Sequence, residues 1–391
     1  MIVFLTYQMT YTLEQIFLYP EVDLNKFLLQ VGDKDDYGSI NRKRYMVVHY
    51  LGSNLSQDKY TQNSNFQIAL LYSNSFDQLR FILNNQYMID LLNNTIITLN
   101  IEDNNLGPKG GQYLAEVLKI NTSLTNLSLG YNGLGPQGGQ FIAEALKINK
   151  SLTNLYLGDN NLGPQGSQFL SEALKVNTSL NILNLGFNYL GPQGGQFLSE
   201  ALKINTLLST LNLGDNNLGP EGAQFLAEAL KINTSLNTLD LKYNNLGPQG
   251  GQYLAEALKV NTSLSTLSLG DNDLGPEGGQ FIAEALKINK SLTNLSLRYN
   301  GLGPEEGQFL ADALKVNTSL ISLNLFGDDL GPLQIDKVNT KLDKNKHYQK
   351  VILPQLKIER LNIYLSLIQS RISHDIIDEL INFHKQIDYF R

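Results

Sequence analysis

The sequence contains no cysteine and no tryptophan, and only four histidines among its 391 residues. The missing cysteine excludes a disulfide framework, a cysteine-ligated zinc or iron–sulfur site and every mechanism that uses a thiol nucleophile. No apolar run approaches the roughly 18 residues of a membrane-spanning helix, and the short run from Ile2 to Leu5 has no basic residues before it. We therefore expect a cytoplasmic protein without membrane association, although composition leaves secretion into a host cell open.

A strong excess of one charge is also missing. The chain has 30 Lys and Arg against 37 Asp and Glu, which gives a net charge of −7. This mild acidity disfavours a protein that follows the phosphates of a nucleic acid, so we expect no nucleic-acid partner. With 42% hydrophobic residues, the chain can bury a core and is not globally disordered.

What the sequence does have is a repeat. The tripeptide Leu-Gly-Pro recurs nine times at a constant spacing of 28 residues, beginning at Leu106, Leu134, Leu162, Leu190, Leu218, Leu246, Leu274, Leu302 and Leu330. A period of this length indicates stacked repeats that bury one continuous core. In the unit 124–151, Leu127 and Leu129 alternate with polar residues, which predicts a short strand with one buried face. Pro136 then precedes an amphipathic helix over about residues 137–148.

The pattern L-x-x-L-x-L-x-x-N-x-L, followed by a helix of the form G-x-x-x-L-A-E-A-L-K, resembles the leucine-rich repeats of the ribonuclease-inhibitor-like class. The resemblance covers residues 96–332 and implies an α/β fold, a right-handed horseshoe of nine strand–turn–helix units with its strands on the concave side. It also implies protein recognition as the shared function. We expect a flank or cap of mixed or helical character over residues 1–95, and a helical cap or tail over 333–391.

The flanks carry no repeat signature. Within them we predict helices over about 75–92, 348–369 and 373–390, and a loop-rich stretch over 31–61. The helical pattern of the repeats is lost after Pro332, where we expect the solenoid to end.

One asparagine recurs at the turn after each predicted strand. Its amide can satisfy the backbone groups of a tight buried turn, so we assign it a structural role. The ladder comprises Asn104, Asn132, Asn160, Asn188, Asn216, Asn244, Asn272 and Asn300, and the ninth unit has Asp328 instead.

The residue before that asparagine alternates between an acid and an aromatic. The series is Asp103, Tyr131, Asp159, Phe187, Asp215, Tyr243, Asp271 and Tyr299. Tyrosine is an efficient interface residue, so we predict a concave strip that binds a protein or peptide with alternating basic and apolar groups. Joint duplication of pairs of repeats would produce the same alternation. Neighbouring strand positions extend the predicted strip with Tyr156, Asp240, Lys242, Arg298 and Phe326.

Catalytic constellations are missing from the repeats. None of the four histidines lies within them, which excludes a Ser-His-Asp triad there, and no phosphate-binding loop occurs. We therefore predict no catalytic residues, no metal site and no cofactor. The expected function is that of a monomeric, non-enzymatic scaffold for a protein or peptide.

Two alternatives come from the resemblance. One is a GTPase regulator like the activators of Ran, although their acidic tail contrasts with the net positive tail here. The other is an adaptor or host-directed effector that uses its flanks to dock onto a larger complex.

Overall fold

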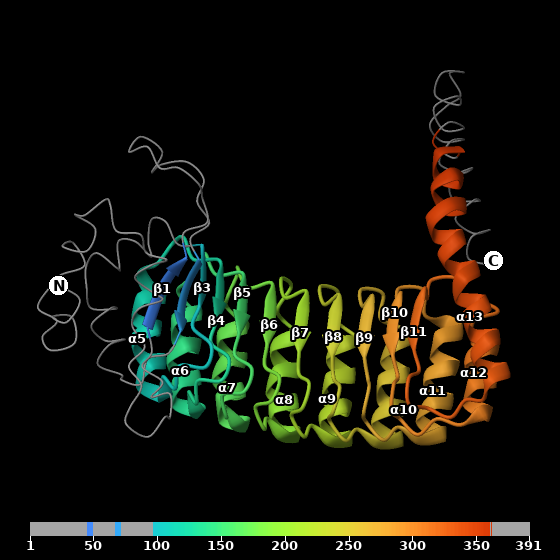
Figure 1. Cartoon of the computed structure of the whole chain (residues 1–391), viewed down its shortest axis with the longest axis horizontal. Helices are drawn as coiled ribbons and strands as arrows, with labels where there is room; N and C mark the ends of the chain where they lie inside the picture. Colours follow the sequence, from blue (N-terminus) through green and yellow to red (C-terminus); the bar gives the residue numbers. More distant parts are fainter. Residues whose placement is uncertain (1–44, 50–66, 72–96, 360, 362–391) are drawn as a thin grey trace, which may run out of the picture. The chain divides into compact units, whose positions relative to one another are not determined.

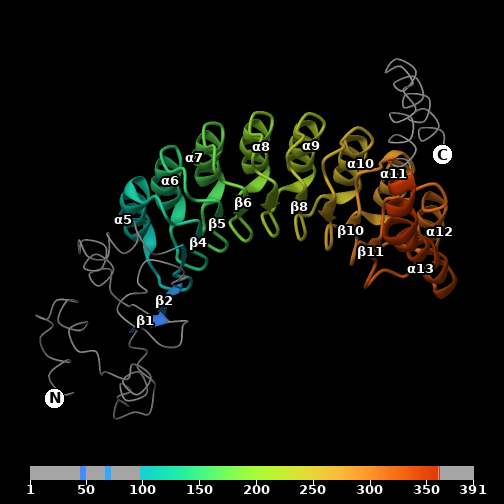
Figure 2. The same ribbon diagram turned by 90° about the horizontal axis from the view of Figure 1, so that it is seen from above.

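The structure is a computed structural model in which residues 45–49, 67–71, 97–359 and 361 are described. The chain consists of two compact units, Met1–Asn217 and Leu218–Arg391. Each unit is a stack of repeats in which a short strand, a tight turn and a helix follow one another (Figure 1). Viewed from above, the strands of each unit line one side and its helices line the other (Figure 2).

The first unit contains seven described strands. They are β1 (Tyr45–His49), β2 (Gln67–Leu71), β3 (Thr98–Asn100), β4 (Asn126–Ser128), β5 (Asn154–Tyr156), β6 (Ile182–Asn184) and β7 (Thr210–Asn212). Strands β2 to β7 are parallel, and their register aligns the central leucine of each repeat, as in the pair Leu127 and Leu155. Strand β1 pairs antiparallel with β2. The helices are α5 (Gly107–Ile120), α6 (Gly135–Leu146), α7 (Gly163–Leu174) and α8 (Gly191–Leu202).

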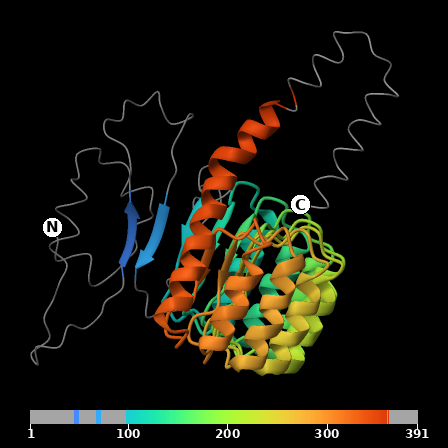
Figure 3. The ribbon, with the colours of Figure 1, turned by 90° about the vertical axis from the view of Figure 1, so that its right-hand side faces the viewer.

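The second unit repeats the arrangement. Its helices are α9 (Gly219–Leu230), α10 (Gly247–Leu258), α11 (Gly275–Ile288), α12 (Pro304–Ala313) and α13 (Pro332–His347), followed by the π-helical turn η3 (Tyr348–Ile352). The parallel strands are β8 (Thr238–Asp240), β9 (Thr266–Ser268), β10 (Asn294–Ser296) and β11 (Ser322–Asn324). Helices and strands form two separate layers (Figure 3).

The core of each repeat lies between its strand and its helix. In the unit 124–151, Leu127, Leu129, Leu134, Ile142 and Leu146 are completely buried. These leucines stack on their counterparts in the next repeat, because the parallel register places identical positions side by side. The stacking gives one continuous apolar core per unit, which no repeat could form alone.

The helices begin two residues earlier than the sequence pattern predicts. Helix α6 starts at Gly135, whose φ of +62° is unfavourable for any residue with a side chain. Pro136 then occupies the first turn, where its missing N–H costs nothing. The predicted strand–turn–helix unit is confirmed, and only the start of the helix differs.

Our prediction that the helical pattern ends after Pro332 is wrong. Helix α13 begins at Pro332, packs against α12 and buries Val338, Leu342 and Asn345. Its apolar stripe is narrow, with most of its other residues exposed, which is why its sequence lacks the repeat pattern. In Figure 3 this helix and its continuation run past the layer of strands.

The flank predictions have mixed outcomes. Residues 348–359 are helical, but they continue α13 through η3 instead of starting a new helix. The loop prediction for 31–61 is wrong at Tyr45–His49, which forms β1. The predicted helices over 75–92 and 373–390 lie outside the described residues. Among the residues described, no helix combines the length and the apolarity needed to cross a bilayer.

Candidate recognition surface

The turn after each strand is held by its buried asparagine. In the first unit, Nδ2 of Asn160 donates hydrogen bonds to the carbonyls of Leu129 (2.9 Å) and Leu157 (3.0 Å), which belong to adjacent repeats. Its Oδ1 accepts from the backbone N–H groups of Asn132 (3.2 Å) and Leu134 (3.3 Å). One side chain therefore satisfies four backbone groups and ties two repeats together. The other described members of the ladder have equivalent contacts, as for Asn272 and Asn300 in the second unit.

The residue before the asparagine, which we call the rung position, has a left-handed backbone. Its φ lies between +53° and +58° at Asp103, Tyr131, Asp159, Phe187, Asp215, Tyr243, Asp271 and Tyr299. Asp and Asn adopt this conformation with little strain, whereas bulky side chains rarely do. The rung residues also extend the strand ladder. The N–H of Tyr131 bonds to the carbonyl of Gly158, and that of Asp159 bonds to the carbonyl of Gly186, each at 3.0 Å.

The strand side of the first unit combines exposed aromatic rings with carboxylates. Tyr131 and Phe187 are exposed, while Asp159 and Tyr156 are partly exposed. The strand and turn segments 97–106, 125–134, 153–162, 181–190 and 209–217 contain no Lys or Arg. Within the described residues, the carboxylates of Asp103, Asp159 and Asp215 have no ion pair. This side is therefore acidic and aromatic.

Tyr189 belongs to the same surface and was missed in the sequence analysis. It lies one residue after the ladder asparagine Asn188, is 63% exposed and has a φ of +54°. The equivalent residues in the neighbouring repeats are Asn161 and Asn217. An aromatic among Asn, Gly and Asp at this position was a readable signal, but only the positive φ shows its cost.

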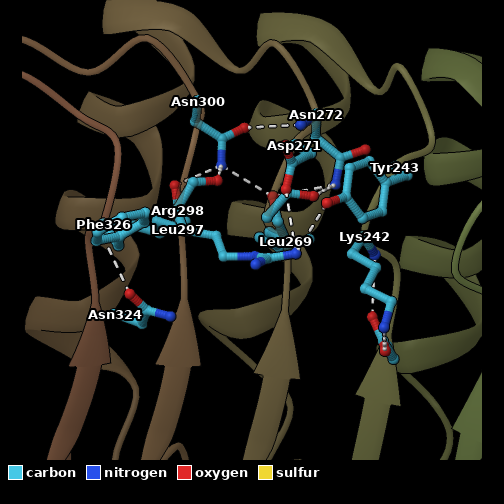
Figure 4. Close-up of polar contacts among 12 residues, drawn as sticks. Lys242, Tyr243, Leu269, Asp271, Asn272, Leu297, Arg298, Asn300, Asn324 and Phe326 are labelled. Atoms are coloured by element: carbon cyan, nitrogen blue, oxygen red, sulfur yellow. Dashed lines mark hydrogen bonds and ion pairs between the residues drawn. The ribbon is translucent and has the colours of Figure 1, made fainter.

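In the second unit, four of the predicted residues come together around Arg298 (Figure 4). Nη2 of Arg298 lies 3.0 Å from the hydroxyl of Tyr243 and 3.4 Å from Oδ2 of Asp271. The guanidinium carbon lies 5.6 Å from the ring centre of Tyr243 and 5.9 Å from that of Tyr299. Arg298 therefore sits between two aromatic rings and beside a carboxylate, which combines an ion pair with cation–π contacts.

Two glycines leave room for this cluster. A Cβ on Gly270 would lie 2.7 Å from Cγ of Arg298, so the arginine side chain runs across a bare backbone. A Cβ on Gly327, whose φ is +82°, would clash with the ring of Tyr299. That ring also packs edge-on against Phe326, with centroids 5.4 Å apart and planes at 86°.

Lys242 and Asp240 form a second pair on this side of the second unit. Nζ of Lys242 lies 3.5 Å from Oδ2 of Asp240, and Oδ1 accepts the backbone N–H of Lys242 at 3.0 Å. The structure thus brings the predicted residues of the second unit into two clusters, whereas the rung residues of the first unit have no contacts of this kind with one another.

The turn of the last repeat departs from the others. Oδ1 of Asp328 accepts from the N–H groups of Asn300 (2.8 Å) and Leu302 (3.0 Å), as an asparagine would. Its Oδ2 is buried without a hydrogen-bond partner. Burial raises the pKa of Asp328 above its usual value, and the backbone donors only partly offset this effect.

The helix side is regular and polar. Each repeat has an ion pair three residues apart, such as Lys147 with Glu144 at 2.7 Å and Lys259 with Glu256 at 2.6 Å. The hydrogen bond and charge of Lys259 lower the pKa of Glu256. After each of these helices comes one exposed aliphatic residue, 50% to 61% accessible: Ile120, Ile148, Val176, Ile204, Ile232, Val260, Ile288 or Val316. In the part of the chain that is described, no group of three or more His, Cys, Asp or Glu could hold a metal ion.

Together, the 28-residue unit, its stacked leucines and its asparagine turn define a protein built from solenoid repeats. A sequence profile described as Leucine Rich repeat matches residues 92–115, 121–143, 176–199, 205–227, 233–255 and 260–283. The chain is a leucine-rich repeat protein of the ribonuclease-inhibitor-like type. Among curated protein sequences, none matches it.

Three solved structures are similar in fold. The leucine-rich repeat-containing protein LegL7 from Legionella pneumophila is 20% identical, with 70% of this chain and 98% of that protein covered and a TM-score of 0.45. Actin-Binding Site 2 of Leiomodin-1 is 24% identical, with 42% and 95% covered and a TM-score of 0.38. The tropomodulin C-terminal domain from Caenorhabditis elegans is 17% identical, with 48% and 96% covered and a TM-score of 0.34. At such TM-scores no partner is transferred from these proteins.

Proposed function

We propose that this protein is a non-enzymatic interaction scaffold whose strand side binds a protein or peptide. Leucine-rich repeats are stacked units that present extended surfaces, and such surfaces typically serve protein recognition. The rung residues, together with Tyr156, Tyr189 and the charged residues Asp240, Lys242 and Arg298, would contact the partner.

The observation that carries the proposal is the cost of the aromatic rungs. Tyr131, Phe187, Tyr243 and Tyr299 are between 39% and 59% exposed, yet all four have a left-handed backbone. A bulky residue in this conformation costs about 1 kcal/mol or more, whereas Asp or Asn would cost less. Burial in the protein's own core does not offset that cost. Contact with a partner would, because large rigid side chains are the usual anchors of interfaces.

The test is a variant that removes the rings and relieves the strain. Replacing Tyr131, Phe187, Tyr243 and Tyr299 by Asn keeps a residue that tolerates positive φ, so the protein should fold with an unchanged or higher melting temperature. The matched control replaces Ile148, Val176, Ile232 and Val260 by Asn, which removes a comparable exposed apolar surface from the helix ends.

Both variants and the wild-type chain would be used to capture partners from a lysate of the source cells, with identification by mass spectrometry. We expect the strand-side variant to lose, by at least tenfold, partners that the control retains. Partners that persist with the strand-side variant and disappear with the control would contradict the proposal and place binding at the helix ends. The GTPase-regulator and adaptor alternatives stay predictions from sequence.

A further inference from the structure

Arg298 occupies a site made by three consecutive rung positions. Tyr243 is the rung before, Asp271 is the central rung and Tyr299 is the rung after. The backbone N–H of Tyr243 bonds to the carbonyl of Gly270, and that of Asp271 bonds to the carbonyl of Arg298, so adjacent rungs are one strand spacing apart. The two rings are therefore about 10 Å apart, which leaves room for one planar guanidinium between them.

The first unit contains the same site without the arginine. Tyr131, Asp159 and Phe187 are three consecutive rungs with φ of +57°, +53° and +58°, against +56°, +57° and +53° for Tyr243, Asp271 and Tyr299. The N–H groups of Tyr131 and Asp159 bond to Gly158 and Gly186, in the same register. Because the backbones match, the three side chains leave the turn in equivalent directions.

The surface under the site also matches. Arg298 runs across Gly270, and the corresponding residue of the first unit is Gly158. A Cβ on Gly158 would approach only the carbonyl of Gly186 at 3.5 Å and Oδ1 of Asn184 at 3.8 Å, so nothing fills the space above it. The counterpart of Arg298 itself is Gly186, which has no side chain to enter the site.

The carboxylate of Asp159 therefore lacks the cation that Asp271 has. No ion pair or side-chain hydrogen bond to it occurs among the described residues, and the strand side of this unit has no Lys or Arg. Both flanking rings are exposed enough to be reached from solvent. Charge complementarity calls for a cation from outside the described chain.

We propose that Tyr131, Asp159 and Phe187 form a binding site for an arginine side chain of a partner protein. This inference rests on the proposed function and names the partner's chemistry. Arginine is favoured over lysine because a planar guanidinium stacks on aromatic faces while its N–H groups reach a carboxylate and a hydroxyl. Arg298 makes all of these contacts at once in the second unit.

The direct test is a titration of the full chain with a capped arginine, N-acetyl-arginine amide, observed by NMR on isotope-labelled tyrosine and phenylalanine rings. We expect saturable shifts at Tyr131 and Phe187. The same titration with capped lysine should give at least threefold weaker binding. Asp159→Asn keeps the shape and tolerates the positive φ, so it should fold normally and weaken the binding of arginine at least tenfold.

Two reciprocal variants use the internal copy of the site. Gly186→Arg supplies the side chain that Arg298 supplies in the second unit, so it should abolish binding at Tyr131, whereas the matched control Gly186→Ala should not. Arg298→Gly should create a new arginine site whose shifts appear at Tyr243 and Tyr299.

The inference is overturned if capped arginine causes no saturable shift at Tyr131 and Phe187. It is also overturned if Asp159→Asn binds as tightly as the wild type, or if capped lysine binds equally well. If these results coincide with partner capture that still needs the aromatic rungs, the proposed function stands and only the arginine site is wrong. If arginine binds but capture ignores the strand side, the proposed function is the part that fails.

Discussion

Nη2 of Arg298 donates a hydrogen bond to the hydroxyl of Tyr243 across 3.0 Å, and so joins two residues that are 55 positions apart in the chain (Figure 4). The contact exists because the parallel register places the turns of successive repeats side by side. It also depends on Gly270, the residue that Arg298 crosses on its way to the ring.

Alanine at the two glycines of this cluster should therefore have unequal effects. Gly270→Ala displaces a flexible arginine side chain, and the loss should not exceed about 1 kcal/mol of unfolding free energy, the value of an exposed pair. Gly327→Ala should cost about 2 kcal/mol, because it adds a side chain at positive φ and pushes the ring of Tyr299 off Phe326. Urea denaturation of both variants checks the order, and equal losses would contradict it.

The asparagine ladder should tolerate no charge. Asn188 is completely buried, and its Nδ2 donates to the carbonyls of Leu157 (2.9 Å), Leu185 (3.0 Å) and Gly186 (3.0 Å). Asn188→Asp would direct a buried carboxylate at these carbonyls and should lower the unfolding free energy by at least about 3 kcal/mol. Asn161→Asp, at an exposed turn residue, is the matched control and should change stability by less than about 0.5 kcal/mol. A loss below about 1 kcal/mol for Asn188→Asp would show that the ladder does not hold the turns.

The opposite change should help at the last turn. Asp328→Asn removes the buried charge and adds an amide that can donate to the carbonyl of Leu325, as Asn300 donates to Leu297 at 2.6 Å. We expect a gain of about 1 kcal/mol at neutral pH, the usual contribution of a hydrogen bond.

The gain from Asp328→Asn should also depend on pH. Burial raises the folded-state pKa of Asp328 above the unfolded value of 3.8, so the wild type loses stability as pH rises from the unfolded through the folded pKa. Below 3.8 the wild-type carboxyl is neutral and the two proteins should differ little. Urea midpoints of both proteins at acidic and neutral pH check this, and a pH-independent difference would show that the charge is not the cause.

Relief of strain should be measurable at Tyr189. Tyr189→Asn installs the residue that the neighbouring repeats have at this position and should raise the unfolding free energy by about 1 kcal/mol. Tyr189→Phe keeps the strained backbone and should leave stability unchanged. Thermal melts of the three proteins decide the matter. A lower melting temperature for Tyr189→Asn would mean that the tyrosine ring stabilises the turn in a way that its 63% exposure does not suggest.

The sequence by itself determined the repeat architecture. The 28-residue period of Leu-Gly-Pro, the alternation at Leu127 and Leu129 and the helical spacing of Ile142 and Leu146 are local patterns that only one strand–turn–helix unit satisfies. It also located the ladder asparagines and the alternating rungs, because any departure is visible against eight nearly identical copies. Helix α13 escaped because an end repeat buries one narrow stripe and no longer needs the full leucine pattern.

Only the tertiary structure decided what the rung residues do. Periodicity carries no information on φ, so the strain at Tyr131 and Tyr189 became visible only in the folded backbone. Nor could sequence alone show that Arg298 fills the space between Tyr243 and Tyr299, because the partners lie in different repeats and their contact depends on register and on a bare glycine between them. Local spacing specifies an element, whereas a site assembled from several elements is specified by the way they stack.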